Sequence, residues 1–267
     1  MVRLIFLGTA GSSAVFTKQT RASGGIILQV EDLQFHIDPG PGALVKAKEF
    51  GVVAQNTTGI LVSHNHLNHC NDLNAVVEAM TYGGIEQRGI VMGSKSALQD
   101  SETTTSFLTK HHRQLVERII PLEKKHKIGL DLLEINSFPA DHTDDHALGF
   151  KFFCPRLVIS YSGDTAYSEE LVDNLMGSDL LILNVPYPGN KSMNGNLDSE
   201  GATKIIAQVK PKLAILTHFG TEMLKADPLV EAREIQRATG VAVIAAQDGL
   251  SISPDNYKNR NPIKGFE

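Results

Sequence analysis

A cluster of three histidines directly after a short apolar stretch constrains this chain more than any other feature of its sequence. Residues 58–63 read TGILVS, which indicates a short buried strand, and His64, His66 and His69 follow it at once. At the histidine frequency of this chain, chance would produce the pattern HxHxxH about 0.01 times over all windows. A tight turn after the strand can aim His64 and His66 at one metal ion, while the next turn aims Asn68 and His69 at a neighbouring ion. Imidazole suits zinc, iron, nickel or copper, so the sequence predicts a metal site.

Such a site needs further ligands from elsewhere in the chain, and we expect them at the ends of other strands. Suitable side chains occur at three such places. They are His142 and His146 before an expected strand at residues 147–153, Asp164 after an expected strand at residues 157–161, and His218 after an expected strand at residues 213–217. His142 and His146 both stay candidates at this point, and the one that does not bind a metal is a candidate for proton transfer or substrate contact.

The order of apolar and polar segments predicts an α/β protein. Strands dominate the N-terminal half and alternate with helices in the C-terminal half, and no linker or internal repeat separates the halves, so we expect a single domain over residues 1–267. Ser168 and Ser199 are expected to cap two of the helices. The other expected strands are residues 3–7, 25–30, 34–37, 90–92, 130–135, 180–184 and 241–245, and the expected helices are residues 43–50, 72–80, 168–176, 199–209 and 228–239.

Composition excludes several classes of protein. The chain has 267 residues and a formal net charge of −5, so no general basic field is present to hold nucleic acid phosphates. Its two cysteines are too few for a disulfide framework and favour a reduced, cytoplasmic protein. No apolar stretch is long enough to span a bilayer, and the N-terminus lacks a cleavage pattern, so we expect no membrane association.

The histidine cluster belongs to a series of six motifs spread along nearly the whole chain. They are Phe6-Leu-Gly-Thr9, His36-Ile-Asp38-Pro-Gly40, His64-Asn-His66-Leu-Asn68-His69, Asp141-His142 followed by Leu148-Gly-Phe150, Ser162-Gly-Asp164-Thr165, and Leu216-Thr-His218-Phe219. In this order the motifs resemble the metallo-β-lactamase superfamily. Within it, the sequences FLGT and LTHF look most like the ribonuclease Z and related phosphodiesterase branch.

The resemblance implies a four-layer αβ/βα sandwich with a dinuclear metal site at one edge. It implies that the first ion is bound by His64, His66 and His142, that the second is bound by Asn68, His69 and His218, and that Asp164 bridges the two ions. We expect Asp38 to hydrogen-bond to the histidine loop without binding a metal itself.

The chain departs from the pattern that it resembles at two positions. Position 68 normally carries an aspartate, and Asn68 leaves the site one unit more positive, which predicts weaker retention of the second ion and a more acidic bridging water. Asn196 stands where ribonuclease Z relatives usually carry a histidine that protonates a leaving group. The substrate-gripping arm of that family is not recognisable either, so transfer RNA processing is disfavoured.

These features predict a metal-dependent hydrolase that cleaves a phosphodiester or other ester-like bond with a metal-bound hydroxide. Asp164 would hold the ions together, and His146 or solvent would supply the leaving-group proton. We expect one or two divalent ions, zinc foremost, with manganese or iron as alternatives. The expected substrate is a small molecule or nucleotide-like, and nucleic acid is a less favoured alternative. Two other interpretations stay open: a mononuclear-iron oxidoreductase similar to persulfide dioxygenases, with His64, His142 and Asp164 as ligands, and a degenerate, non-catalytic member of the fold.

Overall fold

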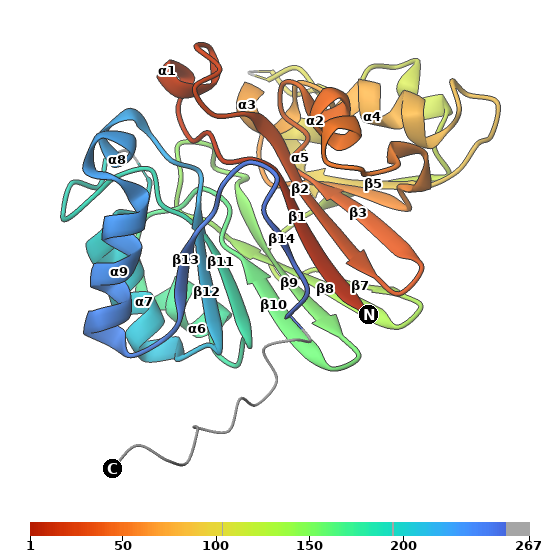
Figure 1. Ribbon diagram of the computed structural model, residues 1–267. Helices are drawn as coiled ribbons and strands as arrows, with labels where there is room; N and C mark the ends of the chain where they lie inside the picture. Colours follow the sequence, from red (N-terminus) through yellow and green to blue (C-terminus); the bar gives the residue numbers. More distant parts are fainter. Residues whose placement is uncertain (103, 194, 255–267) are drawn as a thin grey trace.

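Two seven-stranded β-sheets form the centre of the molecule in the computed structural model, which describes residues 1–102, 104–193 and 195–254 (Figure 1). The first sheet has the strand order β14-β1-β2-β3-β4-β5-β6. Pairing is antiparallel from β14 to β3 and parallel from β3 to β6. Its strands are β1 (Val2–Gly8), β2 (Ser23–Val30), β3 (Leu33–Ile37), β4 (Gly59–Val62), β5 (Ile90–Ser94), β6 (Arg118–Leu122) and β14 (Ser251–Ile252).

The second sheet has the order β13-β12-β11-β10-β9-β8-β7 and faces the first. Here pairing is antiparallel from β7 to β10 and parallel from β10 to β13. Its strands are β7 (Lys127–Leu130), β8 (Leu133–Pro139), β9 (Leu148–Cys154), β10 (Leu157–Tyr161), β11 (Leu180–Asn184), β12 (Leu213–Thr217) and β13 (Val243–Ala245).

Helices cover the outer face of each sheet, so the expected four-layer αβ/βα sandwich is confirmed (Figure 1). Helices α2 and α4 pack on the first sheet, and α6, α7 and α9 pack on the second. The bounds of the helices are α1 (Ser13–Phe16), α2 (Ala43–Glu49), α3 (Leu67–Cys70), α4 (Leu73–Met80), α5 (Lys95–Leu98), α6 (Glu169–Leu175), α7 (Ser199–Val209), α8 (Thr221–Ala226) and α9 (Pro228–Thr239). Two short 3-10 turns lie at Ala54–Asn56 and His112–Gln114.

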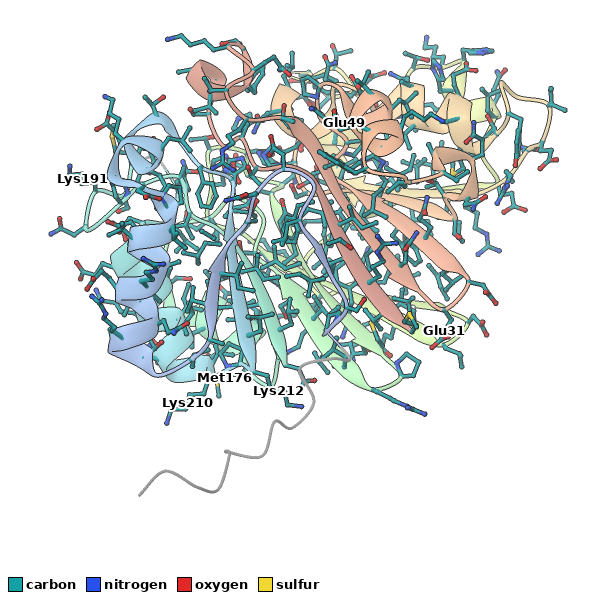
Figure 2. All side chains as sticks on the ribbon, in the orientation of Figure 1. Glu31, Glu49, Met176, Lys191, Lys210 and Lys212 are labelled. Carbon is teal, nitrogen blue, oxygen red and sulfur yellow. The ribbon has the colours of Figure 1, made fainter. Side chains whose placement is uncertain are left out.

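The main hydrophobic core lies between the sheets and is filled by alternate residues of both, including Phe6, Phe35, Phe150 and Phe152, all fully buried. Burial of each such side chain contributes about 2 kcal/mol. Strand β11 is buried on both faces, which explains its unbroken apolar sequence LLIL. Charged side chains such as Glu31, Glu49, Lys210 and Lys212 project outward from the layers (Figure 2).

Local sequence explains how the helices begin, with one correction. Ser168 caps α6 as expected, because its Oγ accepts a hydrogen bond from the Leu171 amide at 3.1 Å. The prediction that Ser199 caps α7 is wrong. Asp198 caps this helix instead, because its carboxylate accepts from the Gly201 amide at 2.8 Å. A carboxylate at this position also interacts favourably with the helix dipole.

Strands β6, β7 and β14 and helix α8 were not expected from the sequence. Strand β7 has the mixed sequence KIGL at the sheet edge, and β14 has only two residues, so neither carries a readable hydrophobic period. No helix among the described residues is both long and apolar enough to cross a membrane.

The carboxyl ends of the parallel strands bring polar residues to one edge of the sandwich. Chain segments leave β3 and β4 of the first sheet and β10, β11 and β12 of the second at this edge. In open α/β sheets such edges are where ligands bind, because strand-end loops converge there. Polar residues at or just beyond the ends of these strands are Asp38, the histidine loop 64–69, Asp164, Asn184 and His218.

Candidate metal centre

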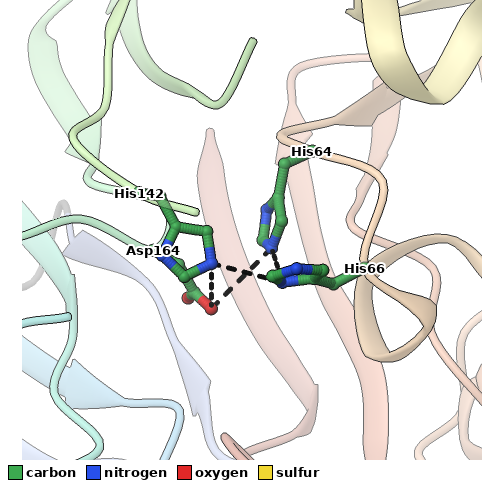
Figure 3. A group of neighbouring side chains, drawn as sticks. All are labelled: His64, His66, His142 and Asp164. Carbon is green, nitrogen blue, oxygen red and sulfur yellow. Dashed lines mark hydrogen bonds and ion pairs between the residues drawn. The ribbon is translucent and has the colours of Figure 1, made fainter. Parts of the chain in front are cut away.

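The first group of candidate ligands consists of His64, His66, His142 and Asp164, whose ligand atoms all lie within 4.8 Å of one another (Figure 3). His66 Nδ1 lies 3.0 Å from His64 Nε2 and 3.2 Å from His142 Nε2. Asp164 Oδ2 lies 3.8 Å from His64 Nε2 and 3.9 Å from His142 Nε2. Two nitrogens on a tetrahedral zinc ion stand about 3.3 Å apart, so the spacing fits one ion between these groups.

In His64 and His142, the hydrogen bond made by Nδ1 shows that Nε2 is the atom free to bind an ion. Ser63 Oγ donates to Asp38 Oδ2 at 2.7 Å, so it accepts from Nδ1 of His64 at 2.9 Å. His142 Nδ1 donates to the carbonyl oxygen of Gly195 at 2.7 Å. Both histidines therefore turn an unprotonated Nε2 toward the centre of the group. Lone pairs that face one another at this distance repel unless a cation lies between them, so the donor set fits a metal ion.

The second group comprises His69, His218 and Asp164, and all three side chains are buried. His69 Nε2 lies 3.0 Å from His218 Nε2 and 3.4 Å from Asp164 Oδ2. His218 Nε2 lies 3.4 Å from Asp164 Oδ1. His69 Nδ1 donates to Asp38 Oδ2 at 2.9 Å, so Nε2 is the ring atom that faces His218 and Asp164. The carboxylate of Asp164 thus lies between the two groups and offers oxygen atoms to both.

Asn68 lies at the margin of the second group, where its Nδ2 is 3.1 Å from His218 Nε2. The amide can present either its nitrogen or its oxygen by a half-turn of the side chain. In either orientation it brings no charge. The second group therefore has one carboxylate, shared with the first group, as its sole negative ligand among the described residues.

Asp38 connects the two sheets through hydrogen bonds beneath the candidate ligands. Its carboxylate accepts from the Ser63 amide and hydroxyl at 2.6 and 2.7 Å and from His69, which are the expected contacts with the histidine loop. It also accepts from Tyr161 Oη at 2.7 Å. Carboxylate–histidine contacts of this kind fix the orientation of a ligating ring.

Tyr161 and Asn184 are functional candidates that the sequence reasoning missed. Asn184 Nδ2 donates to Asp164 Oδ1 at 2.7 Å and to Tyr161 Oη at 3.1 Å. These bonds complete a buried path from Asp38 through Tyr161 and Asn184 to Asp164. The sequence signal was present but weak, because each residue simply ends a strand that reads as buried and apolar.

Electrostatics at the centre suit a bound cation. Burial lowers the pKa of His64 well below its usual value, and the neighbouring His69 adds to this effect. Burial also lowers the pKa of His69, but the carboxylates of Asp164 and Asp38 outweigh it and raise that pKa to about 10. Burial alone would raise the pKa of Asp164, yet His218 and His69 hold it well below its usual range. The pocket thus keeps its carboxylate ionised and attracts positive charge.

Glycine at position 11 lets the first loop approach His218 closely. A Cβ atom there would lie 1.8 Å from the His218 carbonyl oxygen and 2.7 Å from its Nδ1. The Gly11 amide donates to the Phe219 carbonyl at 2.9 Å. His218 itself has a positive φ of 63°, a backbone conformation that is uncommon for residues other than glycine. Gly11 therefore helps to hold a strained ligand loop in place.

Two sequence candidates lie outside both ligand groups. His146 is exposed, and its backbone amide donates to Asp144 Oδ1 at 2.9 Å. Of the two histidines left open by the sequence, the structure brings His142 into the cluster. Asn196 donates to the Met193 carbonyl at 3.1 Å and adjoins Gly195, whose carbonyl orients His142.

Comparison with known proteins decides the family. A model of the β-lactamase superfamily domain matches residues 34–219. The chain belongs to this superfamily. An uncharacterized protein of Methanocaldococcus jannaschii is 31% identical over 96% of this chain and 97% of its own length. The ribonuclease Z of Sulfolobus acidocaldarius is 22% identical over 90% of this chain and 95% of its own length.

Solved structures of the superfamily agree with this assignment. A metallo-β-lactamase fold protein from Bacillus subtilis superposes with a TM-score of 0.79 at 18% identity, over 94% of this chain and 98% of that protein. This likeness shows the fold. Together the comparisons confirm the expected membership of the metallo-β-lactamase superfamily.

Proposed function

We propose that this chain is a metal-dependent hydrolase that cleaves a phosphodiester or other ester-like bond. The observation that carries the proposal is the convergence of histidine ring nitrogens on a buried carboxylate in two adjoining groups. Relatives named ribonuclease Z and metal-dependent hydrolase support the same reaction class. A mononuclear-iron site would use three ligands of the first group and leave the second group without a role.

In this proposal each residue of the two groups has a defined task. His64, His66 and His142 hold the first divalent ion, and Asn68, His69 and His218 hold the second, with Asp164 between them. The ions, when bound, polarise the scissile bond and lower the pKa of water from 15.7 to about 7. Asp38 and Asn184 keep His69 and Asp164 oriented through the hydrogen bonds described above.

Donor chemistry favours zinc as the metal. The two groups offer imidazole nitrogens and one carboxylate, and no thiolate among the described residues joins them. Such a set suits zinc first, with manganese or iron as the alternatives.

His146 is the proposed donor of the leaving-group proton. It lies outside the ligand groups but lines the same groove as His66, so a substrate that extends along this groove would pass it. Histidine is the side chain that most often serves in general acid–base catalysis, and solvent is the alternative proton source.

Elemental analysis combined with a turnover assay tests the proposal. Protein purified without added metal should carry zinc or manganese and hydrolyse bis-p-nitrophenyl phosphate. Asp164→Asn should lose bound metal and at least about a hundredfold in turnover. Asp141→Asn is the matched control, because this exposed aspartate lies outside both groups, and it should keep metal and turnover. One iron per chain with oxygen consumption, or tightly bound metal without hydrolysis of any ester, would overturn the proposal.

A further inference from the structure

A groove with a volume of about 520 Å³ leads away from the first ligand group on the outer side of His66. Three segments form its walls: the histidine loop at Asn65, helix α5 with the loop that follows it, and the loop 143–146. His66 connects the groove to the metal centre, because its Nδ1 faces the other ligands while its Nε2 lies 3.5 Å from Thr143 Oγ1. A group attached to the reacting phosphate can therefore reach the groove by passing over the His66 ring.

Every described side chain that lines this groove is polar. Ser101, Thr104 and Thr143 offer hydroxyls, and Gln99 offers an amide. Such groups both donate and accept hydrogen bonds, so they match the hydroxyl groups of a sugar or glycerol unit. A wall without apolar side chains offers little contact to an acyl chain or an aryl group, whose transfer from water is what usually drives binding in pockets.

The charge of the groove is negative. Asp100, Asp144 and Asp145 line it, whereas its one lysine, Lys95, forms an ion pair with Glu123. Asp144 Oδ2 accepts from the Asn65 amide at 3.0 Å and from Ser96 Oγ at 2.6 Å, so this carboxylate is held in the wall of the groove. A substrate portion that carries several phosphates would be repelled here, since like charges at close range are unfavourable.

We propose that this groove binds an uncharged, hydroxyl-bearing substituent of the phosphodiester, such as a nucleoside or glycerol unit, and disfavours polynucleotides. The inference rests on the proposed phosphodiester hydrolysis and adds the class of substrate. Recognition comes from hydroxyl and amide side chains along the groove, and exclusion comes from its aspartates.

Three substrates with the same p-nitrophenolate leaving group separate these effects: the esters of ethyl phosphate, of thymidine 5′-phosphate and of a four-residue oligothymidylate 5′-phosphate. The thymidine ester should have a KM about tenfold below that of the ethyl ester, which corresponds to one or two net hydrogen bonds. The oligonucleotide ester should have a KM above that of the thymidine ester.

Two variants assign the effects to the groove. Gln99→Leu should raise the KM of the thymidine ester severalfold relative to the ethyl ester, whereas Gln55→Leu, an exposed glutamine in the turn that precedes β4, should not. Asp145→Lys should lower the ratio of oligonucleotide to thymidine KM about threefold, and Asp173→Lys on α6 should leave that ratio unchanged.

The outcomes distinguish the two proposals. Hydrolysis of all three esters with equal KM for the ethyl and thymidine esters, or with the lowest KM for the oligonucleotide, would overturn the groove proposal and leave phosphodiester hydrolysis intact. Failure to hydrolyse any of the esters would overturn both, because the groove then has no substrate to select.

Discussion

At the scale of single residues, the two ligand groups differ in charge although they share a carboxylate. Asp164 contacts both groups, and the neighbouring histidines keep it ionised by lowering its pKa against the effect of burial. Asn68, at the margin of the second group, contributes an uncharged amide. The first group offers three imidazoles to one ion, so we expect the two ions to be held with unequal strength.

Asn68→Asp tests this inequality directly. The added carboxylate should tighten the second ion by at least about tenfold, because a close opposite charge stabilises a divalent cation. Metal content after dialysis, followed by competitive titration with a chelator, measures the change. Asn65→Asp adds the same charge to the same loop outside both groups and is the control. Two ions bound equally tightly in the unsubstituted protein would contradict the expectation.

At the scale of elements, strand β3 serves both the fold and the site. It ends next to Asp38, which orients the histidine loop, and it carries His36 in the buried centre of the first sheet. His36 Nε2 donates to the Gly24 carbonyl of β2 at 2.7 Å, and this bond links the two strands. Burial lowers the pKa of His36 from 6.5 to about 4, although the bond to Gly24 opposes this.

This depressed pKa predicts a loss of stability at acid pH. Between pH 6.5 and about 4 the unfolded state binds a proton at His36 that the folded state does not, so the free energy of unfolding falls as the pH falls through this window. The loss from this residue approaches about 3 kcal/mol at the lower limit. Urea unfolding at several pH values measures it.

His36→Gln is the informative variant, because a glutamine amide can donate to the Gly24 carbonyl without titrating. Its free energy of unfolding should depend less steeply on pH between 6.5 and 4 than that of the unsubstituted protein. His126→Gln, at an exposed histidine, should follow the unsubstituted protein. Identical slopes for all three proteins would show that His36 does not contribute.

At the scale of the whole molecule, the candidate metal centre joins the two sheets. His64, His66 and His69 follow a strand of the first sheet, whereas Asp164 and His218 follow strands of the second. Tyr161 and Asn184 add hydrogen bonds across the same boundary to Asp38. We propose that the whole chain folds as one domain, since neither sheet alone can complete a ligand group.

Removal of metal should therefore destabilise the entire molecule. Metal at a hundred times its Kd stabilises the folded state by about 2.7 kcal/mol, so a chelator should lower the Tm by roughly 5–10 °C in one cooperative transition. Differential scanning calorimetry measures this shift. His142→Ala should start from a lower Tm and respond less to chelator, whereas His111→Ala, outside both groups, should respond fully. A Tm that is insensitive to chelator would exclude metal as a link between the sheets.

Local sequence determined much of the architecture and of the set of candidate ligands. Strands with an unbroken apolar run, such as residues 180–184, were predicted within a residue of their observed bounds, because burial on both faces leaves a composition that can be read locally. The histidine loop was also predicted from local sequence, because its candidate ligands are neighbours in the chain. Short or mixed strands such as β7 and β14 were missed, because their pairing depends on partners that the local sequence does not specify.

The sequence by itself thus determined which residue types stand at the strand ends and in what order, including the uncharged Asn68. Only the tertiary structure decided which of them meet. Asp38 and Tyr161 are 123 positions apart, yet they lie 2.7 Å from each other, and His142 rather than His146 turns toward His66. The polar groove beside His66 is likewise built from three separate segments. Contacts of this kind depend on how two sheets pack face to face, and no local pattern of apolar and polar residues encodes that geometry.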